Sequence, residues 1–334
     1  MKNLIQKKVF ILSESCEELS KFFHTSGYKV YVIYKYDSIK LKDYSFKSLK
    51  LKKISEKKVK LFMKENDPNE KSKILIGSGF AEMMRSKSII GNRLNLGNYP
   101  ETFEKVKSPF FFNVLKKNKI NHPLWSSSSK KNDKWIIKSF LTLGGQKIWN
   151  YNKDDLKEIY FQEKVYGNHL SVQFFVKNKK VKILCFCKQH FKPTKNQPFV
   201  INALSTTVVN SKIENEIKII VSKVSECFDL NGLNNLDLVI SKNKKIYLIE
   251  INPRPGLSFN LLTKLYGKNL FKFNKFAKRD NLGTMIIYSR KKFINKNRTL
   301  KVFKKFSESS DFSELPIENE IIEKNSPICL NHFT

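Results

Sequence analysis

The chain has 334 residues, 40% of them hydrophobic and 13% aromatic, which is enough to bury a sizeable core and excludes a disordered or collagen-like protein. Lysine and arginine number 63 against 30 acidic residues, so the formal net charge is +33. No apolar run reaches the ~18 residues of a membrane-spanning helix, and the first residues include no apolar stretch of signal-peptide length. We therefore expect a soluble, cytoplasmic protein with no membrane partner.

The basic excess is almost entirely lysine, because the chain contains only six arginines. Bidentate contacts to phosphate and guanine favour arginine, and the lysines are spread over the whole chain. We interpret the charge as a compositional bias that produces a solvated basic surface, with no specific nucleic-acid partner. The alternative is a dedicated nucleic-acid-binding face.

Five cysteines are present, and their spacing lacks the paired pattern of a zinc site. Cys185 and Cys187 lie two residues apart in an apolar stretch, so on a strand both side chains would face the same way. We expect reduced thiols in the core; a metal or redox role for this pair is the alternative.

The N-terminal region alternates strands and helices. A strand is predicted over residues 9–12, a helix over about 15–24 and a second strand over 30–34, which indicates a parallel sheet. A third strand over 74–76 leads into Gly77-Ser78-Gly79. Glycines at the end of such a strand permit close backbone approach, so this loop is either the wall of a ligand site or a plain turn.

Residues 101–123 have a helical pattern, and residues 126–133 form a polar connection. From residue 134 the pattern becomes strand-dominated, with one amphipathic helix over 213–228. The predicted strands in this region are 135–138, 146–149, 159–162, 171–176 and 181–186, followed by two more after Gly232.

The strongest local pattern is a pair of apolar strands that carry polar side chains at matched positions. If Asn243-Lys244 is a two-residue hairpin turn, Asp237 lies directly opposite Glu250, and Asn252 shares the face of Glu250. Adjacent buried carboxylates repel unless a cation neutralises them. Carboxylate and amide oxygens suit Mg²⁺, or Mn²⁺ in its place. The alternative is a pair of acids in water at a sheet edge.

A second pattern could hold phosphate. Lys138 ends one predicted strand, and Gly144-Gly145 precedes the next. The glycine N–H groups and the lysine could together contact phosphate oxygens, although the same pattern is also that of an ordinary hairpin.

Together these features resemble the ATP-grasp superfamily of carboxylate–amine and carboxylate–thiol ligases. Residues 250–254 (Glu-Ile-Asn-Pro-Arg) match its metal-binding E-x-N-P-R signature, and Asp237 matches the preceding acidic ligand. Lys138 with Gly144-Gly145 resembles its lysine and glycine loop, and Gln162–Gly167 resembles its hinge segment. The order and spacing match over about residues 110–260.

A closer resemblance, to predicted ATP-dependent carboligases related to biotin carboxylase, covers most of the chain. It rests on the segments Gly77–Phe80, Leu96–Asn98, Ser108–Phe111 and Ser326–Cys329. It implies an α/β protein in which an N-terminal parallel-sheet (pre-ATP-grasp, Rossmann-like) domain precedes a two-lobed α+β ATP-grasp fold. The implied domains are 1–115, an ATP-grasp domain at 116–290 (small lobe about 125–165, large lobe about 166–290) and a C-terminal extension at 291–334.

By this resemblance, a substrate carboxylate would attack the γ-phosphate of Mg-ATP, and an amine or similar nucleophile would take the acylphosphate. Asp237, Glu250 and Asn252 would hold Mg²⁺, Lys138 would neutralise phosphate, and Arg254 would orient the carboxylate unless it merely pairs with Asp237 or Glu250. Lys138 and Arg254 would be the catalytic residues. The residues that would contact ATP are Lys138, Gly144, Gly145, Gln162, Glu163 and Val165, the backbone of Glu163 and Val165 bonding adenine.

The partners would be small-molecule carboxylate and amine substrates. The resemblance leaves open which residue supplies the family's earlier phosphate-binding lysine; Asn113 and Lys116 lie nearby in the sequence. It also leaves open the identity of both substrates and the oligomeric state. A bicarbonate-dependent carboxylase of the biotin carboxylase type is one alternative, and a non-catalytic nucleotide- or nucleic-acid-binding protein is another.

Overall fold

The computed structural model describes the chain in seven stretches, which are residues 7–84, 87–128, 132–140, 148–150, 159–194, 197–272 and 281–334. The chain divides into two compact units: Met1–Pro100 together with Arg254–Thr334, and Glu101–Pro253. The first unit therefore takes in both ends of the chain, and the second is continuous. The three-domain division that the sequence suggests stays a prediction.

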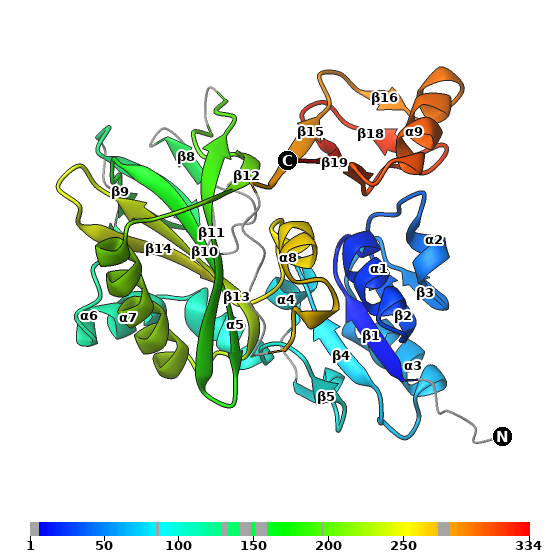
Figure 1. Ribbon diagram of the computed structural model, residues 1–334, viewed down its shortest axis with the longest axis horizontal. Helices are drawn as coiled ribbons and strands as arrows, with labels where there is room; N and C mark the ends of the chain where they lie inside the picture. Colours follow the sequence, from blue (N-terminus) through cyan, green and yellow to red (C-terminus); the bar gives the residue numbers. More distant parts are fainter. Residues whose placement is uncertain are drawn as a thin grey trace. The chain divides into compact units, whose positions relative to one another are not determined.

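The first unit contains a five-stranded parallel sheet with the order β3-β2-β1-β4-β5 (Figure 1). The central strand, β1, is buried from solvent: Val9, Phe10, Ile11 and Leu12 are 0% exposed. This is expected where both faces of a sheet are covered. The parallel pairing predicted for the first three strands is confirmed. The strands are β1 Lys8–Leu12, β2 Lys29–Tyr34, β3 Lys47–Lys50, β4 Lys73–Ile76 and β5 Leu94–Asn95.

Helices accompany this sheet. The helix α8 packs on α1 (Figure 1). The rings of Phe22 and Phe259 lie 5.7 Å apart, and Asn260 Nδ2 donates to Glu18 Oε2 over 2.6 Å. The helices are α1 Glu17–Thr25, α2 Leu41–Tyr44, α3 Glu56–Asn66, α4 Phe80–Met83 and α8 Phe259–Tyr266, with short 3-10 turns η1 Lys87–Ile89 and η2 Gly267–Asn269.

The C-terminal part of the first unit is antiparallel. It is tied to the N-terminal part by the backbone N–H of Glu314, which donates to the carboxylate of Glu17 over 3.0 Å, and by that of Ile39, which donates to the carbonyl of Leu315 over 2.9 Å. Strand β19 pairs with β15 and β17, and β16 pairs with β18. The elements are β15 Gly283–Tyr288, β16 Phe293–Ile294, α9 Arg298–Glu308, β17 Phe312–Ser313, β18 Ile321–Ile322 and β19 Pro327–Phe333.

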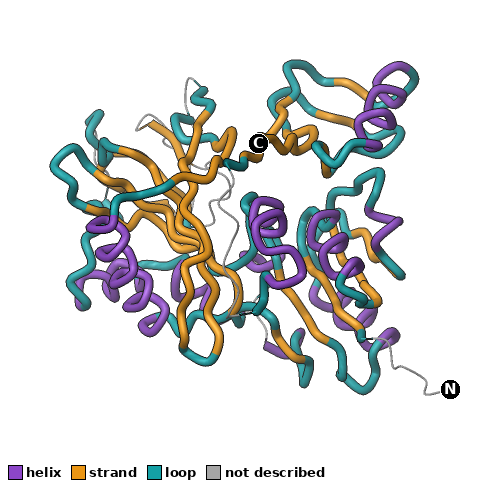
Figure 2. The backbone as a smooth tube through the Cα atoms, viewed as in Figure 1, coloured by secondary structure: helices purple, strands orange, loops and turns teal. Residues whose placement is uncertain are grey.

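The second unit holds two antiparallel groups of strands. The smaller has the order β6-β9-β7-β8, and the larger runs β14-β13-β10-β11-β12, with β10 and β11 forming a long hairpin (Figures 1 and 2). The strands are β6 Trp125–Ser126, β7 Trp135–Ser139, β8 Ile148–Asn150, β9 Ile159–Glu163, β10 Asn168–Lys177, β11 Lys180–Phe191, β12 Ile201–Thr207, β13 Gly232–Ile240 and β14 Ile246–Asn252.

Three helices belong to this part of the chain: α5 Pro100–Val106, α6 Phe110–Lys117 and α7 Ser211–Cys227. The helical pattern predicted over 101–123 forms as two helices, α5 and α6. The break between them falls at Ser108-Pro109, because proline lacks the N–H that a continuing helix needs.

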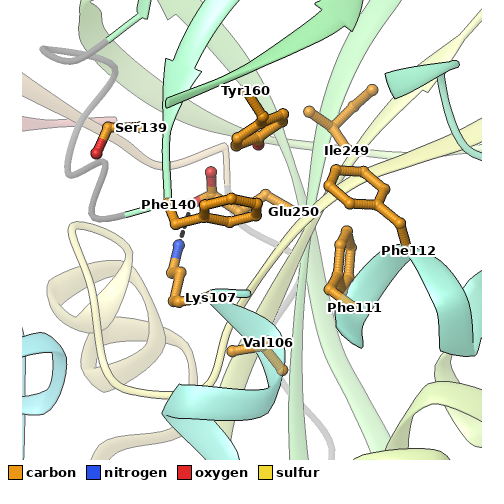
Figure 3. A pocket seen from close by; sticks show the side chains of 9 residues that line it. All are labelled: Val106, Lys107, Phe111, Phe112, Ser139, Phe140, Tyr160, Ile249 and Glu250. Atoms are coloured by element: carbon orange, nitrogen blue, oxygen red, sulfur yellow. Dashed lines mark hydrogen bonds and ion pairs between the residues drawn. The ribbon is translucent and has the colours of Figure 1, made fainter. Parts of the chain in front are cut away.

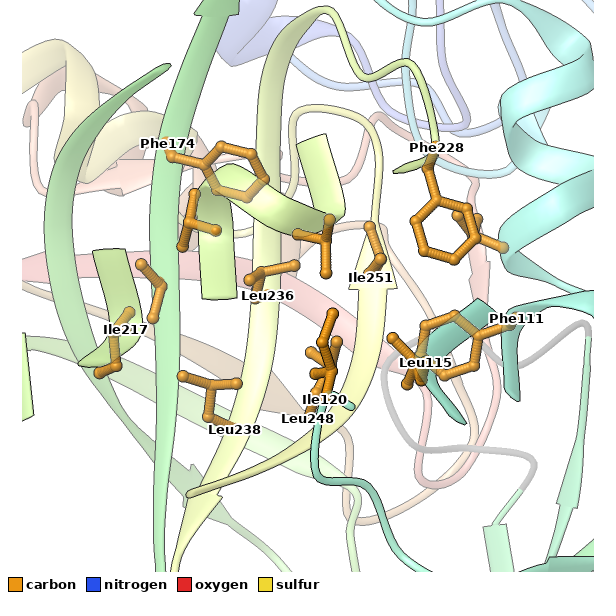
Figure 4. Close-up of a cluster of buried hydrophobic side chains, with 14 of the residues drawn as sticks. Phe111, Leu115, Ile120, Phe174, Ile217, Phe228, Leu236, Leu238, Leu248 and Ile251 are labelled. Atoms are coloured by element: carbon orange, nitrogen blue, oxygen red, sulfur yellow. The ribbon is translucent and has the colours of Figure 1, made fainter. Parts of the chain in front are cut away.

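The core of the second unit forms between α7 and the larger sheet. Asn210 caps α7 by accepting a hydrogen bond from the N–H of Ile213, and the buried residues Ile213, Ile217, Val221 and Val224 recur at helical spacing. Ile217 meets Leu236, Leu248 and Ile251 in one cluster with Phe174 and Phe228 (Figure 4). This packing fixes which face of β13 and β14 is left for polar side chains.

The predicted fold class, a parallel sheet followed by an α+β portion, is confirmed. Within the described stretches, no helix combines the length and apolar character needed to cross a bilayer. The cysteines are free, and Cys185 and Cys187 face the same way on β11, as predicted, with their sulfur atoms 3.8 Å apart.

Candidate functional site

Strands β13 and β14 place Asp237 directly opposite Glu250, as predicted, but by a different route. The predicted two-residue turn at Asn243-Lys244 is wrong. Ile240 pairs with Ile246, so the connecting loop is Ser241–Lys245. Leu238 pairs with Leu248, and Ile249 is then an extra residue, a β-bulge, before Glu250 meets Asp237.

The bulge changes which residues of β14 face the core. Before it, Ile246 and Leu248 are buried in the core cluster, and after it the core residue is Ile251. In a regular strand residues two apart share a face, so Glu250 would follow Leu248 into the core. The extra residue reverses this alternation and turns Glu250 and Asn252 to the opposite face, beside Asp237.

Asp237 is held by a set of hydrogen-bond donors. Its Oδ1 accepts from Ser171 Oγ and from Gln189 Nε2, both over 2.9 Å, and its Oδ2 accepts from Asn252 Nδ2 over 3.2 Å. Burial and the nearby Glu250 carboxylate raise the pKa of Asp237 from 3.8 to about 7. The hydrogen bonds thus fix the orientation of the carboxyl group, while burial and Glu250 disfavour its charged form.

Two lysines lie against Glu250. Lys107 Nζ is 3.1 Å from Glu250 Oε1 (Figure 3). Lys138 Nζ is 3.9 Å from Glu250 Oε2. Lys138 is only 2% exposed, and burial lowers its pKa, although Glu250 and Asp237 act in the opposite direction. Two carboxylates and two ammonium groups therefore share one buried cluster.

A pocket opens beside this cluster. Phe140 stacks on Tyr160 with ring centroids 4.4 Å apart, and Lys107 and Glu250 supply its charged side chains (Figure 3). Ile249 and Glu250, although consecutive, both line it. Among the described residues, those that line it are Val106, Lys107, Phe111, Phe112, Ser139, Phe140, Tyr160, Ile249 and Glu250.

Lys107 is a site residue that the sequence analysis missed. It lies between α5 and α6, directly before Ser108-Pro109, whereas the residues noted from the sequence near the expected position of the earlier phosphate-binding lysine are Asn113 and Lys116. Lysines are so frequent in this chain that one more carries no information by itself. The signal that could have identified Lys107 is the break between the two helices, because the break places its side chain just after the end of α5.

The predicted hinge begins on β9, which lies beside β7, the strand that carries Lys138. Lys138 pairs with Tyr160 and Ile136 pairs with Gln162 on neighbouring strands β7 and β9. The backbone N–H of Glu163 donates to the carbonyl of Leu124 over 2.8 Å, and Val165 lies half-buried in the segment after β9. Gly144 and Gly145, predicted to hold phosphate, lie outside the described residues.

Gly167 ends the hinge at a point of close backbone approach. A Cβ at this position would lie 2.2 Å from the carbonyl oxygen of Ile240 and 2.9 Å from Cα of Ser241. Because the obstacle is backbone, it cannot move aside as a side chain would. Only glycine lets the hinge pass the end of β13 in this way.

Arg254 begins the second segment of the other unit. Its Nε is 2.6 Å from Glu82 Oε1, and Glu82 Oε2 also accepts from the backbone N–H of Gly79 over 2.7 Å. Gly79 passes so close to the β1–α1 loop that a Cβ there would meet the side chain of Glu14. The loop over 77–79 therefore allows the close backbone approach that its glycines suggested.

The side-chain oxygens of Asp237 and its neighbours are suitable ligands for a hard divalent cation. No cluster of three or more His, Cys, Asp or Glu side chains suited to a metal occurs among the residues described, so Asp237 and Glu250 form a two-carboxylate site. With the side-chain oxygen of Asn252 they offer oxygen ligands alone, which is the preference of Mg²⁺ when substrate phosphates complete its shell. A divalent cation would also relieve the repulsion from Glu250, which together with the larger effect of burial raises the pKa of Asp237.

Two curated proteins have sequences similar to this chain, one over most of its length and the other over a short stretch. An uncharacterized protein of Methanocaldococcus jannaschii is 26% identical over 287 residues, which cover 78% of this chain and 69% of that protein. The carbamoyl phosphate synthase large chain of Buchnera aphidicola is 36% identical over 72 residues, 22% of this chain and 7% of the relative.

Solved structures share the fold. N5-carboxyaminoimidazole synthetase from Staphylococcus aureus, complexed with ADP, has a TM-score of 0.74 at 13% identity, and L-amino acid ligase from Bacillus licheniformis has 0.71 at 13%; each comparison covers 98% of this chain and 92% of the other. Biotin carboxylase from Campylobacter jejuni has a TM-score of 0.67 at 13% identity, over 97% of this chain and 86% of the other.

The family model of the ATP-grasp domain matches residues 106–258. The matched range takes in Lys107, Lys138, Asp237, Glu250 and Arg254. The fold of the chain is that of the ATP-grasp ligases, and residues 106–258 belong to the ATP-grasp family.

Proposed function

We propose that the protein is an Mg-ATP-dependent ligase that activates a carboxylate as an acylphosphate and joins it to an amine or a similar nucleophile. The observation that carries this proposal is the buried cluster in which Asp237 and Glu250 meet Lys107 and Lys138. Such a cluster can bind a divalent cation and a polyphosphate together.

Asp237, Glu250 and Asn252 would hold Mg²⁺. The chemistry that Mg²⁺ would supply at these residues is neutralisation of the charge that develops on the phosphate oxygens. Asp237 is already oriented for this by Ser171 and Gln189, so little reorganisation is needed.

Lys107 and Lys138 would bind the phosphates. Both ammonium groups lie against the Glu250 carboxylate. Once Glu250 binds the cation, the two lysines can turn their N–H donors to phosphate oxygens without leaving a buried charge alone. Lys107 would then be the earlier phosphate-binding lysine of this chain.

The reaction would proceed in two displacements. An oxygen of the substrate carboxylate attacks the γ-phosphorus, the bond to the β–γ bridging oxygen breaks, and ADP leaves. The amine nitrogen then attacks the acyl carbon of the acylphosphate, the carbon–oxygen bond breaks, and inorganic phosphate and a proton are released. Arg254, with its planar pair of donors, would orient the carboxylate for the first step.

An ADP-release screen tests the proposal. The wild-type protein is incubated with Mg-ATP and pools of carboxylates and amines, with and without bicarbonate. We expect ADP release that requires both a carboxylate and an amine. Phosphate release that requires bicarbonate alone would support the carboxylase alternative. ATP binding without turnover in any pool would favour a non-catalytic nucleotide-binding protein.

The lysine assignment has its own control. Lys107→Met should lower ADP release at least tenfold, whereas Lys116→Met, on the exposed side of α6, should leave it unchanged. Equal activities of the two variants would contradict the role of Lys107.

A further inference from the structure

The two oxygens of the Asp237 carboxylate have unequal surroundings. Oδ1 accepts hydrogen bonds from Ser171 Oγ and Gln189 Nε2, both over 2.9 Å, and from Asn235 Nδ2 over 3.2 Å. Among the described residues, Oδ2 accepts only from Asn252 Nδ2, over 3.2 Å. A carboxylate oxygen has two lone pairs, so three donors leave no direction open at Oδ1, whereas one direction stays open at Oδ2.

The hydroxyl of Ser171 can bond in only one way. Ser171 is 0% exposed and pairs with Asp237 across β10 and β13. Its oxygen accepts from Gln173 Nε2 and from Asn235 Nδ2, both over 2.9 Å. A hydroxyl has two acceptor positions and a single hydrogen, so this hydrogen must point to Asp237. The network therefore determines that Ser171 is a donor to Oδ1.

Gln189 extends the network onto a third strand. Ser171 pairs with Cys187 on β11, and Gln189 lies two residues further along that strand, on the same face. Its side chain reaches Asp237 over 48 positions of sequence. The three donors to Oδ1 are neutral, so they orient the carboxylate without cancelling its charge, in contrast to the two lysines against Glu250.

A carboxylate that offers one oxygen suits some divalent cations better than others. Mg²⁺ takes an octahedral shell and accepts a single oxygen from each carboxylate, whereas Ca²⁺ takes up to about eight ligands and often uses both oxygens of a carboxylate. With Oδ1 of Asp237 saturated, Ca²⁺ loses a ligand that Mg²⁺ does not need. The hydrogen bonds to Oδ1 thus bear on which cation binds.

We infer that Ser171, Gln189 and Asn235 confine Asp237 to coordination through Oδ2 and thereby make the site discriminate against Ca²⁺. The inference rests on the proposed function, since it assumes that a divalent cation binds at Asp237 and Glu250. The three donors are positioning residues, because they act on the cation through Asp237.

The test compares two metal complexes of a non-hydrolysable ATP analogue. Equilibrium binding of the Mg²⁺ and Ca²⁺ complexes of adenylyl imidodiphosphate is measured on the wild-type protein and on Gln189→Met, which keeps the unbranched shape but donates no hydrogen bond. The wild type should bind the Mg²⁺ complex more tightly. In the variant this preference should fall about tenfold, since hydrogen-bond partners of metal ligands typically change metal affinity by about 10–100-fold.

A second variant and a control separate this role from a structural one. Ser171→Ala should lower the preference in the same way, and the loss of an acceptor for Gln173 and Asn235 should also lower its melting temperature. Ser225→Ala is the matched control, since the buried Ser225 hydroxyl donates to the carbonyl of Val221 over 2.7 Å, and it should keep the wild-type preference. Lower melting temperatures of both site variants with the Mg²⁺ preference intact would overturn the inference.

Failure of the two proposals can be told apart. A wild-type protein that binds neither metal complex contradicts the proposed function itself. A wild-type protein that binds both complexes equally well, or that prefers Mg²⁺ no more than Gln189→Met does, contradicts only the role of the donors to Oδ1.

Discussion

The Nε atom of Arg254 lies 2.6 Å from Oε1 of Glu82, and both side chains are almost completely buried. The two residues are 172 positions apart in the sequence. A buried ion pair of this kind holds the guanidinium in one orientation. It also means that loss of the arginine leaves a buried carboxylate behind.

This pair gives a test of the role of Arg254 that separates stability from chemistry. Arg254→Gln should destabilise the fold by about 3–5 kcal/mol, because Glu82 loses its cation. The double variant E82Q/R254Q should recover most of that stability and still lack ligation activity. Urea unfolding and ADP release on both proteins measure the two effects. Activity that returns together with stability would show that Arg254 is structural.

The metal assignment is tested at Glu250. Glu250→Gln should fold but turn over ATP slower by orders of magnitude, because it loses a charged ligand of the cation. It should also lose the rise in melting temperature that Mg²⁺ with ATP gives the wild type. Near-native turnover by this variant with its substrates would refute the metal site.

The pH dependence of stability is tested at Glu17. Burial, with the Glu18 carboxylate as a smaller cause, raises the pKa of Glu17 from 4.5 to about 7, and its Oε2 accepts from the N–H of Glu314. The folded state thus binds the proton more tightly than the unfolded chain. As the pH rises from 4.5 to 7, the free energy of unfolding should therefore fall, by on the order of 3 kcal/mol from this group.

Glu17→Gln removes that dependence while its amide oxygen still accepts from Glu314. Urea unfolding at pH 5 and pH 8 should therefore show a smaller loss of stability for this variant than for the wild type. Glu65→Gln, at an exposed position of α3, is the matched control and should behave like the wild type. Identical pH profiles for all three proteins would contradict the assignment.

The close approach of the hinge is tested at Gly167. Gly167→Ala places a methyl group against the carbonyl of Ile240, and we expect a loss of about 1–3 kcal/mol in the free energy of unfolding together with weaker ATP binding. Gly97→Ala is the control, since a Cβ there meets only the side chain of Leu75 at 3.5 Å. Melting curves with and without ATP compare the two, and a neutral Gly167→Ala would show that the hinge is not constrained.

The charge of +33 gives a prediction about nucleic acid. If it is a compositional bias, duplex DNA should bind weakly, without sequence preference, and with an affinity that falls steeply between about 50 and 200 mM salt. Fluorescence anisotropy with two unrelated duplexes measures this. Sequence-selective binding at the higher salt concentration would instead identify a nucleic-acid-binding protein.

Local patterns predicted the elements whose apolar residues are regular. Strands β1, β2 and β4 were found because they are continuous apolar runs, and α7 because its buried residues recur at helical spacing. Strand β3, with the sequence Lys-Ser-Leu-Lys, was missed because three of its four residues are exposed and carry no periodic signal. Exposed strands at sheet edges need no apolar pattern, so sequence alone does not mark them.

The site was predicted where its residues are close in the sequence and missed where they are not. Asp237, Glu250 and Asn252 lie on one hairpin, so strand alternation was sufficient to pair them. Lys107 reaches Glu250 over 143 positions of sequence, and only the packing of the second unit brings them together. The turn of the hairpin was wrong and the pairing right, because the longer loop and the bulge at Ile249 offset each other.

The bulge at Ile249 divides β14 into two registers. Before it, Ile246 and Leu248 face the core; after it, Ile251 faces the core while Glu250 and Asn252 face the candidate site. Ile249 itself belongs to neither register, yet it lines the pocket. An engineer who wants a differently shaped pocket could therefore vary this one residue, since its neighbours keep their partners on β13.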